Sequence, residues 1–396
     1  MNRLSTTRNA IAAAHTHEGK YHAQLKPLLK LAFCTTLLFG FSCKKTPGPA
    51  DKPDVVNGRF AALHVSTSMD NTLVVDDKGA LWATGKNSGQ ALGLGSSSAQ
   101  RRFARVMDDV ATASVTESRS LVIKRDGSVW TAGSNNFGEL GIGDQPSDGG
   151  FKKVMDAAAQ VEAGDAYGFI IKADHTLWAA GFNRDEMFGS AFSNGQILNT
   201  YTKIADNVRA VSAGLGHVLL LKTDHSLWAC GRNIEGELGI GNFNEQRGFV
   251  KVMDGVKAIK ALDYHSLIIK TDNSLWVAGN NKYGELGLGN NVNQNQFQKV
   301  TEEVAQLAGG RFFSLIIKND GSLWASGYNN SGTFGMEGND TNRFIKVTTD
   351  VAAVAAADYH SFIIKTDRSF WASGSNTYGV LGMGNIDQLT KFTQVK

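Results

Sequence analysis

The sequence predicts an all-β protein, a seven-bladed β-propeller of four-stranded blades. Three observations support this: a motif that recurs through the chain, short apolar segments inside each recurrence, and 44 glycines in 396 residues, which suit a turn-rich fold. Each recurrence contains one tryptophan, and successive tryptophans are 48, 48, 50, 48, 48 and 47 residues apart. Such a period indicates a solenoid or a propeller, in which no unit buries its own apolar surface.

The recurrence around Trp276 illustrates the strands that we expect. It contains four short apolar segments, at residues 256–262, 266–270, 274–278 and 297–300. The second and third are apolar on both sides of the pleat, as in strands buried on both faces. Asp272 and Asn273 between them form a hairpin signal, because Asn accepts the positive φ that such turns require. Four antiparallel strands at this period describe a propeller blade, and seven units fit a closed ring.

Three positions are identical in all seven recurrences: a glycine 3 residues after the tryptophan, an asparagine 5 after it and a glycine 11 after it. We expect the glycines to take backbone angles or close contacts that a Cβ would prevent. The asparagine amides are expected to hydrogen-bond the loop backbone. Residues that every unit needs are structural, and the same interpretation applies to the tryptophans.

The motif L-W-A-x-G-x-N-x-x-G-x-L-G-x-G, preceded by G-x-x-H-S-L, resembles the repeat of the regulator of chromosome condensation family. The resemblance covers residues 59–396 and implies a seven-bladed β-propeller. Gln90 in the first recurrence and Glu186 in the third replace a glycine of the loop, so we expect these two loops to deviate from the others.

The charge of the chain argues against nucleic-acid binding. Residues 1–42 hold five basic residues and one acidic residue, and without them the 40 basic and 37 acidic residues of the chain fall to a net charge of −1. A neutral propeller without a basic run has little attraction for a phosphate backbone. The chromatin role that the resemblance implies, promotion of nucleotide exchange on a small GTPase, is therefore not expected here.

The N-terminal segment predicts where the protein resides. Residues 31–41 form an apolar run that is too short to span a bilayer but suits the core of a signal peptide. The run ends at Gly40-Phe41-Ser42-Cys43, which looks like a bacterial lipoprotein cleavage site. We therefore expect a signal peptide at 1–42, a lipid on Cys43, a Pro-rich tether at 43–58 and the propeller at 59–396. This places the protein in the bacterial cell envelope, on the periplasmic side or the cell surface.

The sequence contains no recognisable catalytic motif, and we expect no enzyme activity, catalytic residue, metal or cofactor. The most suggestive motif is Asp-Tyr-His, at residues 263–265 and 358–360. These histidines are interpreted as turn-stabilising residues, with a metal or catalytic role as the weaker alternative. Cys230 is the single cysteine of residues 59–396 and is expected to be a small buried side chain.

One face of the ring is predicted to carry the function. If the strands of each blade alternate in direction, the first turn and the third loop of every blade emerge on the same face, and their sequences vary freely between blades. The hairpin between the second and third strands is nearly uniform. On the variable face, three consecutive blades carry the candidate binding residues Tyr264, Tyr283, Phe312, Tyr328, Tyr359 and Tyr378. Exposed aromatic clusters are typical anchors of protein or sugar recognition.

We interpret the chain as a monomeric, lipid-anchored binding propeller with a macromolecular partner. A protein partner leads, because the resemblance includes secreted bacterial propellers that cap β-lactamases with aromatic-rich loops. A polysaccharide partner is the alternative, and a hydrolase or lyase is the third. Arg232 and Arg311 beside a continuous aromatic surface would favour a protein, whereas paired planar rings beside carboxylates would favour a sugar.

The ends of the repeat region predict how the ring closes. The first recurrence begins at residues 60–63, and the last ends at residues 392–395. We expect these two segments to pair, so that the last strand completes the first blade and removes an open edge.

Overall fold

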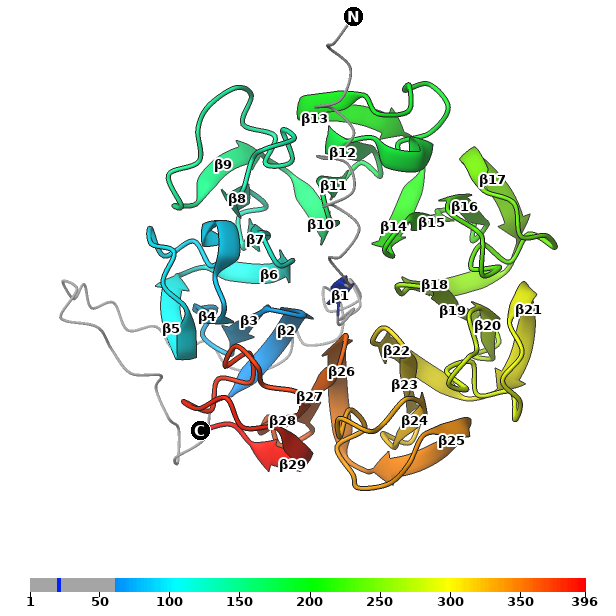
Figure 1. Cartoon of the computed structure of the whole chain (residues 1–396). Coiled ribbons are helices and arrows are strands. Elements are labelled where there is room, and N and C mark those ends of the chain that lie inside the picture. Colours follow the sequence, from blue (N-terminus) through cyan, green and yellow to red (C-terminus); the bar gives the residue numbers. More distant parts are fainter. Residues whose placement is uncertain (1–19, 23–60) are drawn as a thin grey trace, which may run out of the picture.

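The computed structural model describes residues 20–22 and 61–396, and residues 61–396 form a closed ring of seven antiparallel sheets around a central axis (Figure 1). The first blade contains β2 (Ala62–Ser68), β3 (Asn71–Asp76), β4 (Leu81–Gly85) and β5 (Gln100–Met107). A short strand, β1 (Lys20–His22), pairs with β2, so this sheet has five strands, whereas the other six have four.

The other six blades follow in chain order. Blade 2 contains β6 (Val110–Val115), β7 (Arg119–Lys124), β8 (Val129–Gly133) and β9 (Lys152–Met155). Blade 3 contains β10 (Ala158–Ala163), β11 (Tyr167–Lys172), β12 (Leu177–Phe182) and β13 (Ile197–Ala205). Blade 4 contains β14 (Val208–Ala213), β15 (His217–Lys222), β16 (Leu227–Gly231) and β17 (Gln246–Met253). Blade 5 contains β18 (Val256–Ala261), β19 (His265–Lys270), β20 (Leu275–Gly279) and β21 (Gln294–Thr301). Blade 6 contains β22 (Val304–Gly309), β23 (Phe313–Lys318), β24 (Leu323–Gly327) and β25 (Thr341–Thr348). Blade 7 contains β26 (Val351–Ala357), β27 (His360–Lys365), β28 (Phe370–Gly374) and β29 (Leu389–Gln394). The predicted fold class is confirmed.

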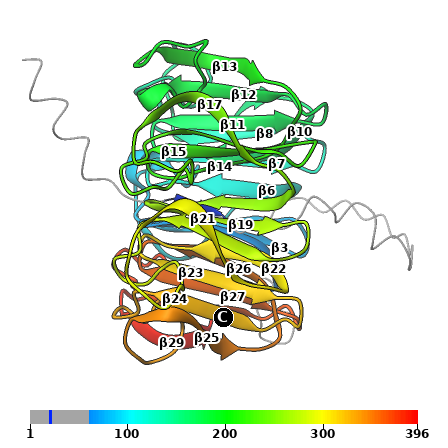
Figure 2. The same cartoon turned by 90° about the vertical axis from the view of Figure 1, so that its right-hand side faces the viewer.

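The strands run from one face of the disc to the other, which Figure 2 shows edge-on. In blade 5 the amide of Asn280, which follows the third strand, donates to the carbonyl of Tyr264 in the first turn at 2.9 Å. The amide of Val304 donates to the carbonyl of Asn273 in the hairpin, also at 2.9 Å. The first turns and third loops therefore share one face, here called the loop face, and the hairpins share the opposite, hairpin face, as predicted.

The hairpin sequences are uniform because their residues hold the tryptophan of the blade in place. The indole of Trp276 donates to the hydroxyl of Ser274 at 2.8 Å, and that hydroxyl donates to Asp272 at 2.5 Å. The ammonium of Lys270 lies 4.9 Å from the centre of the indole ring. The indole makes the same bond to a Ser or Thr in six blades, whereas Trp82 donates directly to Asp76 at 2.8 Å. The hairpin face is thus built to one pattern.

The repeated glycines and asparagines frame the loop face. Gly279 has φ of 109°, and a Cβ there would lie 2.5 Å from the carbonyl oxygen of Tyr264. The side-chain oxygen of Asn281 accepts from the amide of Leu286 at 3.0 Å, while its NH₂ donates to the carbonyl of Asn290 at 2.9 Å. Both expectations for these positions are confirmed.

The loops at Gln90 and Glu186 deviate, as expected. Both residues replace the glycine yet keep positive φ, at 64° and 54°. Within residues 61–396, these two loops alone form 3₁₀ turns, η3 (Ser88–Gln90) and η4 (Arg184–Glu186).

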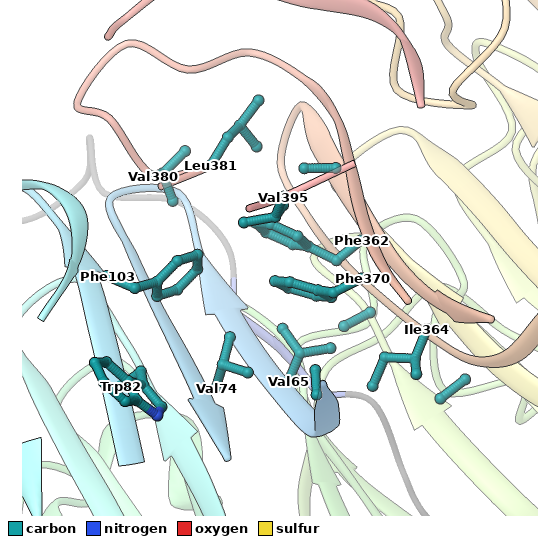
Figure 3. Close-up of a cluster of buried hydrophobic side chains, with 14 of the residues drawn as sticks. Val65, Val74, Trp82, Phe103, Phe362, Ile364, Phe370, Val380, Leu381 and Val395 are labelled. Carbon is teal, nitrogen blue, oxygen red and sulfur yellow. The ribbon is translucent and has the colours of Figure 1, made fainter. Parts of the chain in front are cut away.

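Ring closure differs from the prediction. The expected pairing of residues 60–63 with 392–395 is wrong, because β29 completes blade 7 and β5 completes blade 1. Each repeat supplies all four strands of its own blade, so neither end has a vacancy to fill. The ring closes through contacts between the complete blades instead: Phe103 of blade 1 lies 6.1 Å from Phe370 of blade 7, centre to centre, in a cluster that buries Val395 (Figure 3). The backbone adds a bond from the amide of Gly384 to the carbonyl of Arg101 at 2.7 Å.

One position in the ring links each blade to the next. It is the first residue of the second strand, and in blades 4, 5 and 7 it is a buried histidine. His217 and His265 bond to Ser266 and Ser314 of the following blade, each at 2.9 Å, and His360 bonds to Thr67 of blade 1 at 2.7 Å. The expectation that these histidines stabilise their own turns is therefore corrected: they bridge neighbouring blades.

Other residue types make the same blade link elsewhere. In blade 1, Asn71 donates to the carbonyl of Thr116 at 3.0 Å. In blade 3, Tyr167 donates to the carbonyl of Gly214 at 3.3 Å. In blade 2, the buried Arg119 donates to backbone carbonyls of blade 3. The position thus tolerates several side chains provided that they span the gap between blades.

The buried histidines should make the ring sensitive to acid. Burial lowers the pKa of His265 to about 3, from an ordinary value of 6.5. A lowered pKa gives stability that is complete above pH 6.5 and is lost as the pH falls towards 3, because the unfolded chain binds the proton more readily. We expect His265→Asn, a residue that blade 1 uses in this position, to fold and to remove about 1.4 kcal/mol per pH unit from the acid slope between these values.

Urea unfolding at several pH values between 4 and 7.5 would measure the slope. His175→Asn is the matched control, because His175 is exposed in the hairpin of blade 3, where blade 5 has Asn273. Equal slopes in His265→Asn and the wild type would contradict the assignment of this histidine as a buried, neutral link.

Candidate functional site

The loop face gathers the exposed apolar side chains of the ring. Of the seven large hydrophobic residues that are exposed within residues 61–396, all but Leu63 lie in the third loops or at the strand that follows one: Phe137, Ile197, Ile234, Phe243, Val292 and Ile386. The hairpin face has none of these six. An uneven distribution of this kind marks a surface suited to interaction rather than a scatter of single residues.

Five of the six predicted aromatic residues form one continuous group, here called the aromatic cluster. Tyr264 stacks on Phe312 with ring centres 5.9 Å apart and an interplanar angle of 19°. Phe312 lies 4.9 Å from Tyr283, Tyr283 lies 5.5 Å from Tyr328, and Tyr328 lies 5.9 Å from Tyr359. All five side chains are half-buried, so part of each ring remains accessible. The cluster spans the neighbouring loops of blades 5, 6 and 7, on the right and at the bottom of Figure 1.

Tyr378 does not join this cluster. It lies at the boundary between blades 7 and 1, where the ammonium of Lys86 sits 4.5 Å from the centre of its ring. Lys86 also pairs with Asp70 at 3.0 Å. The structure therefore brings five of the six predicted residues together and places the sixth, Tyr378, elsewhere on the same face.

The backbone around the cluster is held firmly. The amide of Tyr328 donates to the carbonyl of Phe312 at 2.9 Å, which ties the two loops of blade 6 together. The amide of Tyr283 donates to the carboxyl group of Glu285 at 2.8 Å. Glu285 is fully buried, and burial raises its pKa to about 7. The rings are thus presented from a fixed frame, which reduces the entropy that binding would cost.

Two arginines cover part of the cluster. The guanidinium of Arg232 lies 4.8 Å from the ring centre of Tyr264, and that of Arg311 lies 5.0 Å from the ring centre of Phe312. Arg311 also donates to the phenol oxygen of Tyr264 at 3.2 Å. Burial raises the pKa of Tyr264, so this phenol is neutral at physiological pH. Cation–π contacts of this kind attract the guanidinium groups to the ring faces and help to hold the rings in place.

The tyrosines and the histidines of the Asp-Tyr-His motifs have different structural roles. Their tyrosines belong to the cluster, and their histidines serve as blade links to Ser314 and Thr67. Their aspartates, Asp263 and Asp358, are 1% exposed. In the described part of the chain, no group of three His, Cys, Asp or Glu side chains is placed to hold a metal ion.

Two further expectations concern cysteines. Cys230 is fully buried beside the carbonyl of Met187, and burial raises the pKa of its thiol, so the interpretation as a small core residue is confirmed. Cys43, the signal peptide apart from residues 20–22 and the tether at 43–58 lie outside the described residues.

Sequence reasoning missed two exposed apolar residues in the third loops of blades 4 and 5, Phe243 and Val292, here called the apolar rim. Phe243 stands between Asn242 and Asn244, and Val292 stands between two asparagines in the same way. A single apolar residue in an Asn-rich loop has no strand or core to join, and this is the signal that would have identified both.

Comparison with known proteins finds one repeat family in two stretches of the chain and several solved structures with a similar fold. The family model described as "Regulator of chromosome condensation (RCC1) repeat" matches residues 208–237 and 304–333. Among solved structures, yeast RCC1 (Prp20) in complex with Kap60 is similar at 17% identity and a TM-score of 0.71, covering 91% of each chain.

Two more solved structures have the same fold. Prp20p from Saccharomyces cerevisiae is 17% identical with a TM-score of 0.71, covering 87% of this chain and 89% of its own. Human WBSCR16 is 19% identical with a TM-score of 0.70, covering 80% of this chain and 93% of its own. Among curated proteins, none matches the chain. At these identities the likeness establishes the seven-bladed fold.

Proposed function

We propose that this propeller of regulator of chromosome condensation repeats binds a protein partner through the aromatic cluster, while a lipid on Cys43 holds it in the bacterial cell envelope. The observation that carries the first part is the cluster itself, in which five rings from three blades are in continuous contact. Tyr and Arg are enriched among the residues that dominate the energy of protein interfaces, and aromatic side chains bury a large area with few rotatable bonds. The apolar rim would extend the contact beyond the cluster.

The ring geometry favours a protein over a sugar at this site. A flat sugar needs an accessible ring face, but three of the four ring pairs in the cluster are tilted, at 50°, 80° and 70°. The one near-parallel pair, Tyr264 and Phe312, has arginine guanidinium groups over its rings. The neighbouring carboxylates of Asp263 and Asp358 are buried, which removes them from direct contact with a ligand.

The similar structures give independent support for a binding role. Yeast RCC1 was solved bound to Kap60, and the description of Prp20p names binding to Gsp1p and histones. Proteins of this fold thus present surfaces to other proteins. A net charge of −1 outside residues 1–42 argues against transferring the nucleic-acid context. The proposed partner is therefore a protein of the cell envelope, bound by a monomeric propeller.

The start of the first blade bears on how an anchored ring would be oriented. β2 begins on the hairpin face, where Ala61 pairs with Ser369 of the last hairpin. A tether at 43–58 would therefore reach the ring from the hairpin face, and the aromatic cluster would point away from the membrane. Within residues 20–22 and 61–396, no helix is long and apolar enough to cross a bilayer. Cleavage before Cys43 would also remove β1, a strand that six of the seven blades do without.

Removing the cluster should abolish binding without unfolding the ring. Tyr264, Phe312 and Tyr359 share one position in the first turn, which is Asp70, Ser118, Ala166 or Gly216 in the other blades. We expect the triple variant Tyr264→Ala, Phe312→Ala, Tyr359→Ala to keep its circular dichroism spectrum. Truncating one central anchor typically costs on the order of 2–4 kcal/mol of binding energy, so the partner should no longer be captured after cross-linking in intact cells.

A Ser118→Ala variant, altered at the same position of blade 2, is the matched control and should retain the partner. Unfolding of the triple variant would show that these rings belong to the core. A folded triple variant that still captures the partner would move the binding face elsewhere, for example to the loop at residues 184–196.

The anchor is tested separately. Cys43→Ser should either leave the precursor uncleaved or release the propeller from the membrane fraction, because stable anchoring requires more than one acyl chain and the serine accepts none. Fractionation of cells and the mass of the mature protein measure both outcomes. A Cys230→Ser variant controls for general cysteine effects. A cleaved Cys43→Ser protein that stays in the membrane fraction would contradict the proposal.

A further inference from the structure

A second candidate site lies on the loop face, away from the aromatic cluster. A groove of about 800 Å³ is formed by the third loops of blades 1 and 2 and the start of β13 in blade 3. These blades lie on the left and at the top of Figure 1, and blades 2 and 3 lie across the ring from blades 5 and 6, whereas blade 1 adjoins blade 7. Blade 2 contributes most of it because β9 has 4 residues, which leaves a long loop between β8 and β9. This volume is in the range of small-ligand sites, which is roughly 300–1,000 Å³.

The walls of the groove are fixed by hydrogen bonds within and between blades. The NH₂ of Asn135 donates to the carbonyls of Gly143 and Gln145 at 3.2 and 3.3 Å. The amide of Gly143 donates to the carbonyl of Asn199 in blade 3 at 2.8 Å. The side chain of Asn199 in turn donates to Asp144 at 2.9 Å. The loop of blade 2 is therefore pinned to blade 3, and the groove is preformed.

An exposed aromatic ring stands in this groove. Phe137 is 43% exposed, although its ring leans on Phe182 with centres 5.6 Å apart. Its backbone amide donates to Glu139 at 2.6 Å, and Glu139 is buried 3.8 Å from Arg119. The ring is thus held in place from below while much of its surface stays accessible. In blades 1 and 6 the same position is Gly89 or Ser331, so the blade itself does not require an aromatic residue.

Apart from Phe137, the apolar side chains that line the groove are Ile197 and Pro146, and the polar ones are mostly neutral. Amides predominate, Ser134 adds a hydroxyl, and Asp144 is the one charged residue among those that line the groove. The side-chain amides of Asn136 and Gln145 make no hydrogen bond within residues 61–396, so both are available to a ligand. An amide offers a donor and an acceptor on adjacent atoms, which matches a hydroxyl group that both donates and accepts.

We propose that this groove binds a neutral oligosaccharide. The negative face of the Phe137 ring attracts the polarised C–H groups of a pyranose ring, while Asn136 and Gln145 bond to its hydroxyls. A cationic or anionic sugar is disfavoured, because one carboxylate and no basic side chain line the groove. The site is independent of the protein-binding role proposed for the aromatic cluster, and it would let one loop face engage a glycan and a protein at separate places.

The test uses the purified full chain and four neutral probes: maltohexaose, cellohexaose, laminarihexaose and xylohexaose. Isothermal titration is expected to show binding of at least one, with a Kd of roughly micromolar to millimolar, the range of weak ligand binding. The double variant Phe137→Ala, Gln145→Ala should weaken this binding by at least about tenfold, which corresponds to about 1.4 kcal/mol. Tyr378→Ala, at the position in blade 7 that corresponds to Phe137, is the matched control and should bind as the wild type does.

Three results would overturn the proposal. The first is that none of the four probes binds. The second is unchanged binding by the double variant with an unchanged circular dichroism spectrum. The third is loss of sugar binding in the Tyr264→Ala, Phe312→Ala, Tyr359→Ala variant, which would place the sugar on the aromatic cluster. Because the partner capture assay reports on the cluster alone, failure of one proposal leaves the other measurable.

Discussion

Each blade of this ring has two apolar faces and covers neither of them by itself, so closure of the circle is the condition on which the rest of the structure depends. The middle strands are buried on both sides, and the apolar clusters are shared between adjacent blades. Polar blade links run in the same direction around the ring, made by histidine, asparagine, tyrosine or arginine at one position. Buried polar groups are tolerated there because each finds a partner in the next blade.

Because closure is secured in the middle of the disc, the two faces can differ. The hairpin face is committed to one arrangement of Asp, Ser, Trp and Lys, and its sequence varies little. The loop face needs only its glycines and the asparagine at each loop start, as in Asn281 with Leu286 and Asn290. Positions between them are free to change, and the aromatic cluster, the apolar rim and the groove at Phe137 all occupy such positions.

The repeat made much of this predictable. Comparison between blades identified the strands, the two faces, the frame residues and five aromatic residues that prove to be in contact. The comparison failed for features that depend on contacts between different blades. Pairing of the termini was inferred from the end of the repeat, but β29 belongs to a complete blade. The partner of His265 is 49 residues away, which its own turn does not reveal. The groove depends on contacts of Phe137 with Phe182 and of Asp144 with Asn199, which no single repeat contains.

We propose that the loop face, and the arc around the aromatic cluster in particular, meets the partner in the cell. Site-specific photo-cross-linking tests it most directly, with the reactive residue placed at Lys282 or Asn330 beside the cluster, or at Thr271 or Thr366 on the hairpin face, all four of which are exposed. We expect the same protein adduct from both loop-face positions and none from the hairpin face. An adduct that forms only at Thr271 or Thr366 would contradict it.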